Sequence, residues 1–134
     1  MKRLLYTLVV ALAAFGCVSR NPKPAEVSNR TIEICGASRS DTLRLGRLHA
    51  GETVVQSVDV LNGCDTVAVI ERIECGCACL SAEFDYAPVM PQQRRTLKIT
   101  LDTRSLGGWV LRRVDIHAAG QTEPYKLWLE AEVE

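Results

Sequence analysis

The residues with the clearest chemical potential are the six cysteines of this 134-residue chain. Three of them, Cys75, Cys77 and Cys79, alternate with single residues. Three thiolates this close could hold a soft metal ion such as Cu(I) or Zn, or could exchange through mixed disulfides. The sequence offers no convincing fourth ligand, and Arg72 is the one cation beside the cluster that would lower a thiol pKa. We therefore predict a structural or oxidised cluster that needs no cofactor, and we keep metal binding or redox activity at these residues as the alternative.

The N-terminal segment indicates where these thiols would act. Lys2 and Arg3 precede an apolar run from Leu4 to Phe15, which is followed by Gly16 and Cys17. The run is too short for a membrane-spanning helix, which needs roughly 20 apolar residues, so it predicts an export signal. A small residue before Cys17 suits a lipoprotein signal peptidase, and we expect cleavage there and lipidation of Cys17. Ordinary signal cleavage near the same place, or an uncleaved helix at the start of a cytosolic protein, are the alternatives.

This interpretation divides the chain into three segments. Residues 1–16 are the lipoprotein signal peptide, residues 17–36 the lipidated N-terminus with a flexible tether, and residues 37–134 one folded domain. The chain carries 16 Lys plus Arg and 16 Asp plus Glu, and this balance gives no reason to expect nucleic-acid binding. We expect a protein of the bacterial cell envelope that is lipid-anchored to a membrane, and we favour the side that faces the periplasm.

The domain shows the two-residue periodicity of β-strands. In residues 53–62, Val54, Val58 and Val60 fall on one face, and residues 125–133 alternate apolar with charged side chains. The predicted strands span residues 42–48, 53–62, 66–74, 95–102, 109–117 and 125–133. Turn residues separate them and no amphipathic helix follows the signal. We therefore predict an all-β fold, an immunoglobulin-like antiparallel β-sandwich of about seven strands.

Export makes disulfide bonds the default role of the remaining cysteines. Cys64 and Cys75 flank an expected strand of about ten residues, whose ends lie some 30 Å apart, and this excludes a bond between them. An antiparallel hairpin of residues 42–48 with 53–62 would return Cys64 to the residues before the first strand. Cys35 lies there, so we predict a Cys35–Cys64 bridge.

Within the cysteine cluster the geometry of an extended chain favours one pairing. Cys77 and Cys79 point the same way on such a chain, and a ring closed by so few residues would be strained. We therefore expect Cys75 to pair with Cys79 if a bond forms there. With Cys17 lipidated, five cysteines remain, so at least one thiol is left over in a monomer.

Several strings along the chain resemble one bacterial family. They are Leu43-Arg44-Leu45-Gly46, Gly51-Glu52, Asn62 to Asp65, Ile70 to Ile73, Cys77-Ala78-Cys79, Pro88 to Pro91, Leu101-Asp102 and Gly108. Together they make residues 43–133 similar to the domain-of-unknown-function family numbered 1573. The resemblance implies an exported, often lipid-anchored protein of Bacteroidetes and related bacteria. It also implies an immunoglobulin-like domain with no established activity.

The chain departs from the pattern of that family in three places. The family's Cys-Gly-Cys corresponds to Cys77-Ala78-Cys79, so its shared pair maps onto these two cysteines, and an additional Cys75 precedes them. A second register would align Cys75-Gly76-Cys77 instead. Cys64 replaces the family's turn glycine, and Pro91-Gln92-Gln93 replaces its Pro-Gly-Glu turn.

The sequence lacks the motifs of the common enzyme classes, including Gly-x-Ser-x-Gly, His-Glu-x-x-His and a phosphate-binding glycine loop. We expect His49 and His117 to face solvent, and Trp109 and Trp128 to pack in the core or at its rim. The leading hypothesis is a lipid-anchored binding or scaffolding module without catalytic activity, whose partner is an unidentified envelope protein. The alternative is a thiol-based metal-binding or redox protein built on the same sandwich.

Overall fold

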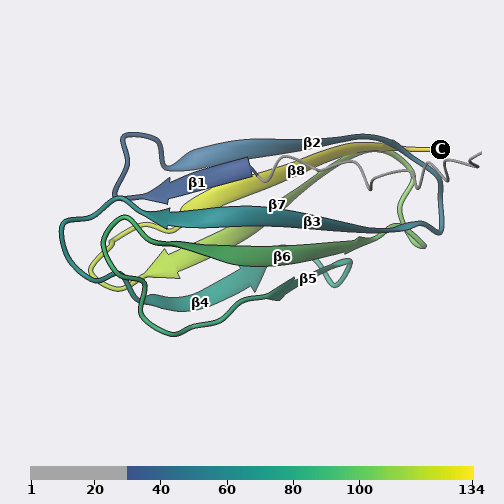
Figure 1. Cartoon of the computed structure of the whole chain (residues 1–134). Coiled ribbons are helices and arrows are strands. Elements are labelled where there is room, and N and C mark those ends of the chain that lie inside the picture. Colours follow the sequence, from purple (N-terminus) through teal and green to yellow (C-terminus); the bar gives the residue numbers. More distant parts are fainter. Residues whose placement is uncertain (1–29) are drawn as a thin grey trace, which may run out of the picture.

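The computed structural model describes residues 30–134, which form an all-β fold without helix (Figure 1). Its strands are β1 (Arg30–Ile34), β2 (Ser40–Leu48), β3 (Thr53–Asn62), β4 (Ile70–Cys75), β5 (Leu80–Glu83), β6 (Arg94–Asp102), β7 (Gly108–Ala118) and β8 (Tyr125–Val133). The expected signal peptide, Cys17 and most of the expected tether lie outside the described residues. Within residues 30–134 no helix could cross a membrane.

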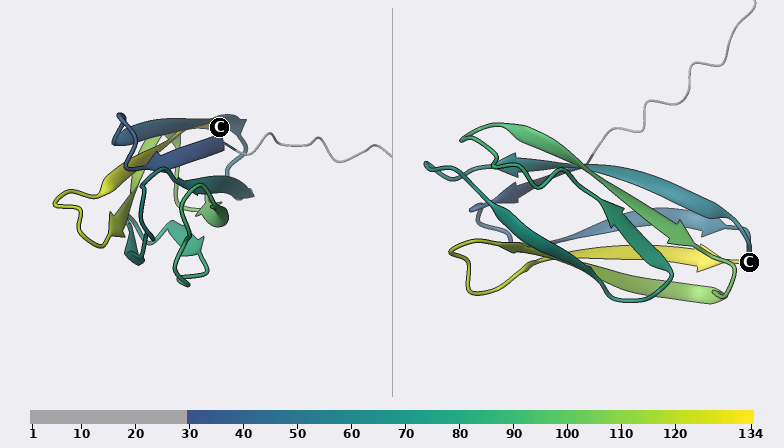
Figure 2. Two further views of the ribbon diagram at one scale, coloured as in Figure 1. Left: turned by 60° about the vertical axis from the view of Figure 1, so that its left-hand side comes forward. Right: turned by 90° about the horizontal axis from the view of Figure 1, so that it is seen from below.

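The strands form two four-stranded sheets, ordered β1-β3-β6-β5 and β2-β8-β7-β4. The sheets are the two layers of a sandwich, which can be followed in Figure 2. Both sheets are mixed, because β1 pairs parallel with β3 and β2 parallel with β8. The prediction of a purely antiparallel sandwich is therefore wrong. The expected hairpin of residues 42–48 with 53–62 is also absent, since β2 and β3 lie in different sheets.

The core lies between the two sheets and is built from alternate side chains of each strand. On β8, Leu127, Leu129, Ala131 and Val133 are buried, while the residues between them are partly exposed, which confirms the predicted alternation. Leu97 on β6 is fully buried on the other side of the core. Burial of one such Leu side chain contributes about 1.5–3 kcal/mol, so the paired apolar faces hold the layers together.

Two short strands extend the domain beyond the prediction. Residues Arg30–Ile34 form β1 at the edge of one sheet, although the tether was expected to reach residue 36. Leu80–Glu83 form β5 at the opposite edge of that sheet. The strand expected at residues 66–74 begins only at Ile70, and Ala68 instead makes an isolated antiparallel bridge with Val89.

Candidate functional site

The bond between Cys35 and Cys64 is present, with 5.3 Å between the two Cα atoms. The two cysteines are brought together by a different strand pairing from the predicted hairpin. β1 runs parallel to β3 with Ile34 opposite Asn62, so the residues that follow each strand lie side by side. The bridge therefore ties the end of an edge strand to its neighbour.

Asn62 organises the chain around this bridge. Its side chain is 1% exposed, and its Nδ2 donates to the carbonyls of Thr66 at 2.9 Å and Val89 at 2.8 Å. Its Oδ1 accepts a hydrogen bond from the backbone N–H of Cys64 at 2.9 Å. The amide thus satisfies three backbone groups at this end of the sandwich. Sequence reasoning missed this role, although Asn62 begins one of the family strings.

The cysteine cluster is bonded differently from the prediction. Cys77 is joined to Cys79, with 5.2 Å between their Cα atoms, and Cys75 has no disulfide partner. The preference for a bond between Cys75 and Cys79 is therefore wrong. The chain turns at residues 76–79 on its way from β4 to β5, so the extended geometry behind that preference does not apply. A Cα separation of 5.2 Å lies in the ordinary range for disulfides.

The segment of residues 76–79, here called the cysteine loop, is fixed at both ends by backbone hydrogen bonds. Gly76 N–H donates to the Arg113 carbonyl at 2.8 Å, and Asp102 N–H donates to the Cys79 carbonyl at 2.8 Å. A Cβ on Gly76 would lie 2.9 Å from the Arg113 oxygen, so this close approach requires glycine. The loop is thus held to β7 and β6 independently of its disulfide.

Cys75 is the remaining thiol of the cluster. It is half-buried against the hydrophobic core, and burial raises the pKa of its thiol above the ordinary value. A raised pKa keeps the group protonated at neutral pH, which disfavours both metal ligation and nucleophilic attack. Within residues 30–134 no group of three or more His, Cys, Asp or Glu side chains is arranged to hold a metal ion. In this bonded state Cys75, Cys77 and Cys79 do not offer three thiolates together.

A surface depression lies beside Cys77. Gly76, Leu111, Arg112, Arg113 and Trp128 complete its lining. The Arg113 guanidinium lies 5.5 Å from the centre of the Trp128 ring, and Arg113 Nε lies 2.8 Å from Asp115 Oδ1. Arg112 donates to the Leu111 carbonyl at 3.0 Å, and it has no ion-pair partner among residues 30–134. The walls of the depression are therefore both apolar and cationic.

The predicted surroundings of Trp109 and His117 differ from those in the structure. Trp109 is 66% exposed, so it is not part of the core. His49 is exposed as expected, whereas the His117 side chain is only 19% exposed. His117 lies on β7 opposite Arg72 of the neighbouring strand β4, and its Nε2 lies 3.2 Å from a carboxylate oxygen of Glu74 on that strand.

Apolar side chains gather on the surface at the opposite end of the sandwich from the cysteine loop. Ala68 and Val89 are buried and exchange backbone hydrogen bonds of 2.9 and 2.8 Å. Their chain neighbours consequently point outward on the other face of this short ribbon. Four exposed side chains, here called the apolar rim, lie on these two segments: Val67, Val69, Tyr86 and Met90.

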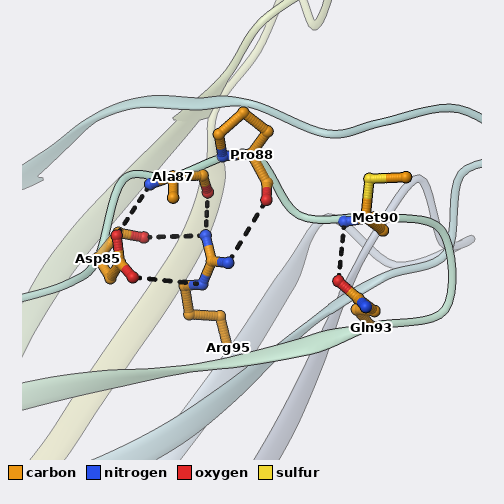
Figure 3. A network of polar contacts seen from close by, with 6 residues as sticks. All are labelled: Asp85, Ala87, Pro88, Met90, Gln93 and Arg95. Carbon is orange, nitrogen blue, oxygen red and sulfur yellow. Dashed lines mark hydrogen bonds and ion pairs between the residues drawn. The ribbon is translucent and has the colours of Figure 1, made fainter.

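Arg95 holds the segment that carries half of this rim (Figure 3). Its guanidinium donates to the carbonyls of Asp85, Ala87 and Pro88. Arg95 Nε also lies 4.0 Å from the Asp85 carboxylate, which accepts a hydrogen bond from Ala87 N–H. The loop is thereby fixed by one half-buried side chain, and Tyr86 is held within it.

The fold and these features define a small all-β sandwich domain that is stapled by two disulfides. The sequence profile of one family, described as protein of unknown function (DUF1573), matches residues 37–133. The chain therefore belongs to this family of unknown function. No curated protein matches the sequence.

Solved structures resemble the fold at low sequence identity. A protein of unknown function from Porphyromonas gingivalis W83 is 19% identical with a TM-score of 0.62, and the match covers 69% of this chain and 44% of that protein. The VesB protease of Vibrio cholerae is 12% identical with a TM-score of 0.58, and 69% of this chain covers 30% of it. A family 123 glycoside hydrolase from Clostridium perfringens is 7% identical with a TM-score of 0.59, and 69% of this chain covers 22% of it. The chain thus spans less than half of each, and these likenesses concern the fold alone.

Proposed function

We propose that this protein is a non-catalytic binding or scaffolding module of the bacterial cell envelope, anchored to a membrane through a lipid on Cys17. In this proposal the sandwich is immunoglobulin-like and faces the periplasm, and it binds an envelope protein through the apolar rim. The observation that carries the proposal is the rim itself, whose side chains are exposed while Arg95 fixes the backbone of the loop that contains Tyr86.

The envelope location is supported by the disulfides and by the N-terminal sequence. Bonds such as Cys35–Cys64 persist in oxidising compartments and are rare in the cytosol. The basic residues, short apolar run and Gly16-Cys17 of the first segment support export and lipidation. Replacement of Cys17 by Ser should therefore release the protein from membranes during a high-salt wash. Retention of Cys17→Ser in the membrane fraction would refute the lipid anchor.

Binding through the rim is supported by its exposure and its rigidity. Exposed apolar clusters often mark interaction sites, because their burial removes apolar surface from water. Val67 precedes buried Ala68 and Met90 follows buried Val89, and two backbone hydrogen bonds join these buried residues, so the backbone at both rim positions is held in place. A fixed surface loses little conformational entropy when a partner binds. We infer a protein partner that presents apolar side chains.

A matched pair of valines tests this function. Val67 and Val55 are 45% and 51% exposed, but Val55 lies on β3, away from the rim. The lipid-free chain would be immobilised by a tag and used to capture partners from an envelope extract, followed by titration with the purified partner. We expect Val67→Ser to weaken this binding at least fivefold, since an exposed valine would otherwise be buried, with Val55→Ser as the control. Equal binding by both variants would refute the rim as the binding surface.

The metal-binding alternative makes a different prediction. Protein isolated from an oxidising compartment would contain stoichiometric copper or zinc if Cys75, Cys77 and Cys79 formed a metal site. Joint replacement of the three by Ser would then remove the metal and the cellular function while the domain stayed folded. Under our proposal this triple variant keeps its partner, and the wild-type protein carries no stoichiometric metal.

A further inference from the structure

We propose that the Cys77–Cys79 disulfide is an exchange site that accepts two electrons from a dithiol of a partner protein. This activity is separate from the binding function proposed above, because the cysteine loop and the apolar rim lie at opposite ends of the sandwich. Three observations support it: the small loop that the bond closes, the independent anchoring of that loop, and the cationic depression beside Cys77.

The bond has little to contribute as a structural staple. It joins residues only two positions apart, whereas Cys35 and Cys64 are 29 positions apart. The shorter the loop that a disulfide closes, the less it restricts the unfolded chain. The cysteine loop is also held by Gly76 and Cys79 through their backbone hydrogen bonds to neighbouring strands. Opening the bond would therefore leave two thiols on an intact scaffold.

The surroundings of Cys77 suit an approaching thiolate. Cys77 is half-buried and lines the depression that Arg112 and Arg113 share with two apolar side chains. Arg113 is paired with Asp115, but Arg112 has no such partner among the described residues and keeps a free positive charge. A nearby cation stabilises a thiolate relative to a thiol. The depression would thus attract the attacking partner thiolate and later stabilise the thiolate of Cys77.

The exchange balances in two steps. In the first, a partner thiolate attacks Cys77 Sγ, a mixed disulfide forms, and the Cys77–Cys79 bond breaks with its electron pair moving to Cys79 Sγ, which takes a proton from water. In the second, the second thiolate of the partner attacks the partner sulfur of the mixed disulfide, and Cys77 leaves as a thiolate beside Arg112. The partner dithiol is oxidised to a disulfide, and Cys77 and Cys79 are reduced.

The Cys35–Cys64 bond of the described chain serves as the internal control. Cys75 is half-buried against the core with a raised thiol pKa, so it is a poor nucleophile at neutral pH. The Cys35–Cys64 bond closes a long loop and joins two strands of one sheet. Selective opening of one bond therefore distinguishes an exchange site from general reduction of the protein.

The first test uses the mature chain with Cys17→Ser and Cys75→Ser, and a synthetic peptide with two cysteines as the dithiol probe. Alkylation and mass spectrometry would follow each bond, and circular dichroism would follow the fold. We expect the peptide to become oxidised while Cys77 and Cys79 are reduced, with Cys35–Cys64 intact and the fold unchanged. The proposal is overturned if the peptide stays reduced, or if Cys77–Cys79 opens only when the domain unfolds.

The second test measures the reactivity of Cys77 directly. With Cys79→Ser added to the same chain, the rate of mixed-disulfide formation with the oxidised peptide reports the thiolate of Cys77 as a function of pH. We expect a pKa below the ordinary value, and Arg112→Gln to slow the reaction by about threefold at pH 7 through loss of thiolate. Arg94→Gln, at the far end of β6, is the matched control and should leave the rate unchanged. An ordinary pKa, or equal rates in both arginine variants, would contradict the role of the depression.

Discussion

The two disulfides of this domain should differ greatly in their contribution to stability. The perturbation is a pair of matched double variants, Cys35→Ala with Cys64→Ala and Cys77→Ala with Cys79→Ala. Each variant removes one bond and two sulfur atoms, and all four residues lie outside the fully buried core. The difference between the variants therefore reports mainly the loop that each bond closes.

The magnitude follows from the two sequence separations. Cys35 and Cys64 are separated by 29 residues and Cys77 and Cys79 by 2. The chain-entropy relation for cross-links gives about 3.6 kcal/mol for a loop of about 30 residues and about 1.6 kcal/mol for a loop of about three. A domain of this size has a free energy of unfolding of about 5–15 kcal/mol, so loss of the first bond removes a large part of it.

Urea unfolding of the lipid-free chain, followed by tryptophan fluorescence without reductant, measures both losses. We expect the Cys35/Cys64 variant to lose about 2 kcal/mol more than the Cys77/Cys79 variant, with the difference taken at matched m-values. Equal losses, or a larger loss for the Cys77/Cys79 variant, would refute the reasoning. Such a result would also make Cys77–Cys79 a structural bond and weaken the case for exchange.

Three further predictions follow from single contacts. Asn62→Asp places an oxygen, in place of a donor, against two backbone carbonyls. We expect the free energy of unfolding in urea to fall by at least about 2 kcal/mol, and a fall of under about 0.5 kcal/mol would contradict this role. The hydrogen bonds of Asp41 with the Arg30 guanidinium lower the carboxyl pKa below 3.8 in the folded state, so its contribution is complete above that value and is lost as the pH falls through the folded pKa. Asp41→Asn should therefore reduce the steepness of acid unfolding, and an unchanged acid slope would count against this pair. Gly76→Ala places a Cβ 2.9 Å from the Arg113 carbonyl oxygen. We expect the free energy of unfolding to fall by about 1–3 kcal/mol and backbone hydrogen exchange in the cysteine loop to become faster. Unchanged exchange would contradict the close approach.

The long strands of the fold could be predicted because their side-chain alternation is a local signal. β3, β7 and β8 each alternate buried with more exposed residues over much of their length, and their expected positions agree with the structure. β1 and β5 have five and four residues, so too few positions alternate to distinguish them from a loop. Strand content was thus predictable where strands are long.

Strand order could not be predicted in the same way. The alternation pattern led to the expectation of a hairpin between residues 42–48 and 53–62, but β2 pairs with β8 and β1 with β3, both in parallel. These pairings join segments distant along the chain and leave no periodic trace in either one. The bond of Cys35 with Cys64 was therefore predicted correctly from an incorrect strand layout.

The candidate sites were predictable only as residue types. Cys77 and Cys79 were recognised as a pair by the family resemblance, but their bond depends on the turn at residues 76–79 and on Gly76 contacting Arg113. The apolar rim was not foreseen, because exposed Met90 looks the same in sequence as a buried methionine. Only the isolated bridge between the two segments shows which side chains point outward.

Site-specific photo-crosslinking in living cells tests the central claim most directly. A photoreactive amino acid would replace Met90 in one anchored variant and Val55 in another, two positions of 49% and 51% exposure. We predict one discrete envelope-protein adduct from position 90 and none from position 55, with the adduct lost when Arg95→Ala frees the loop. Absence of an adduct at position 90, or equal adducts from both positions, would contradict a binding module that acts through the apolar rim.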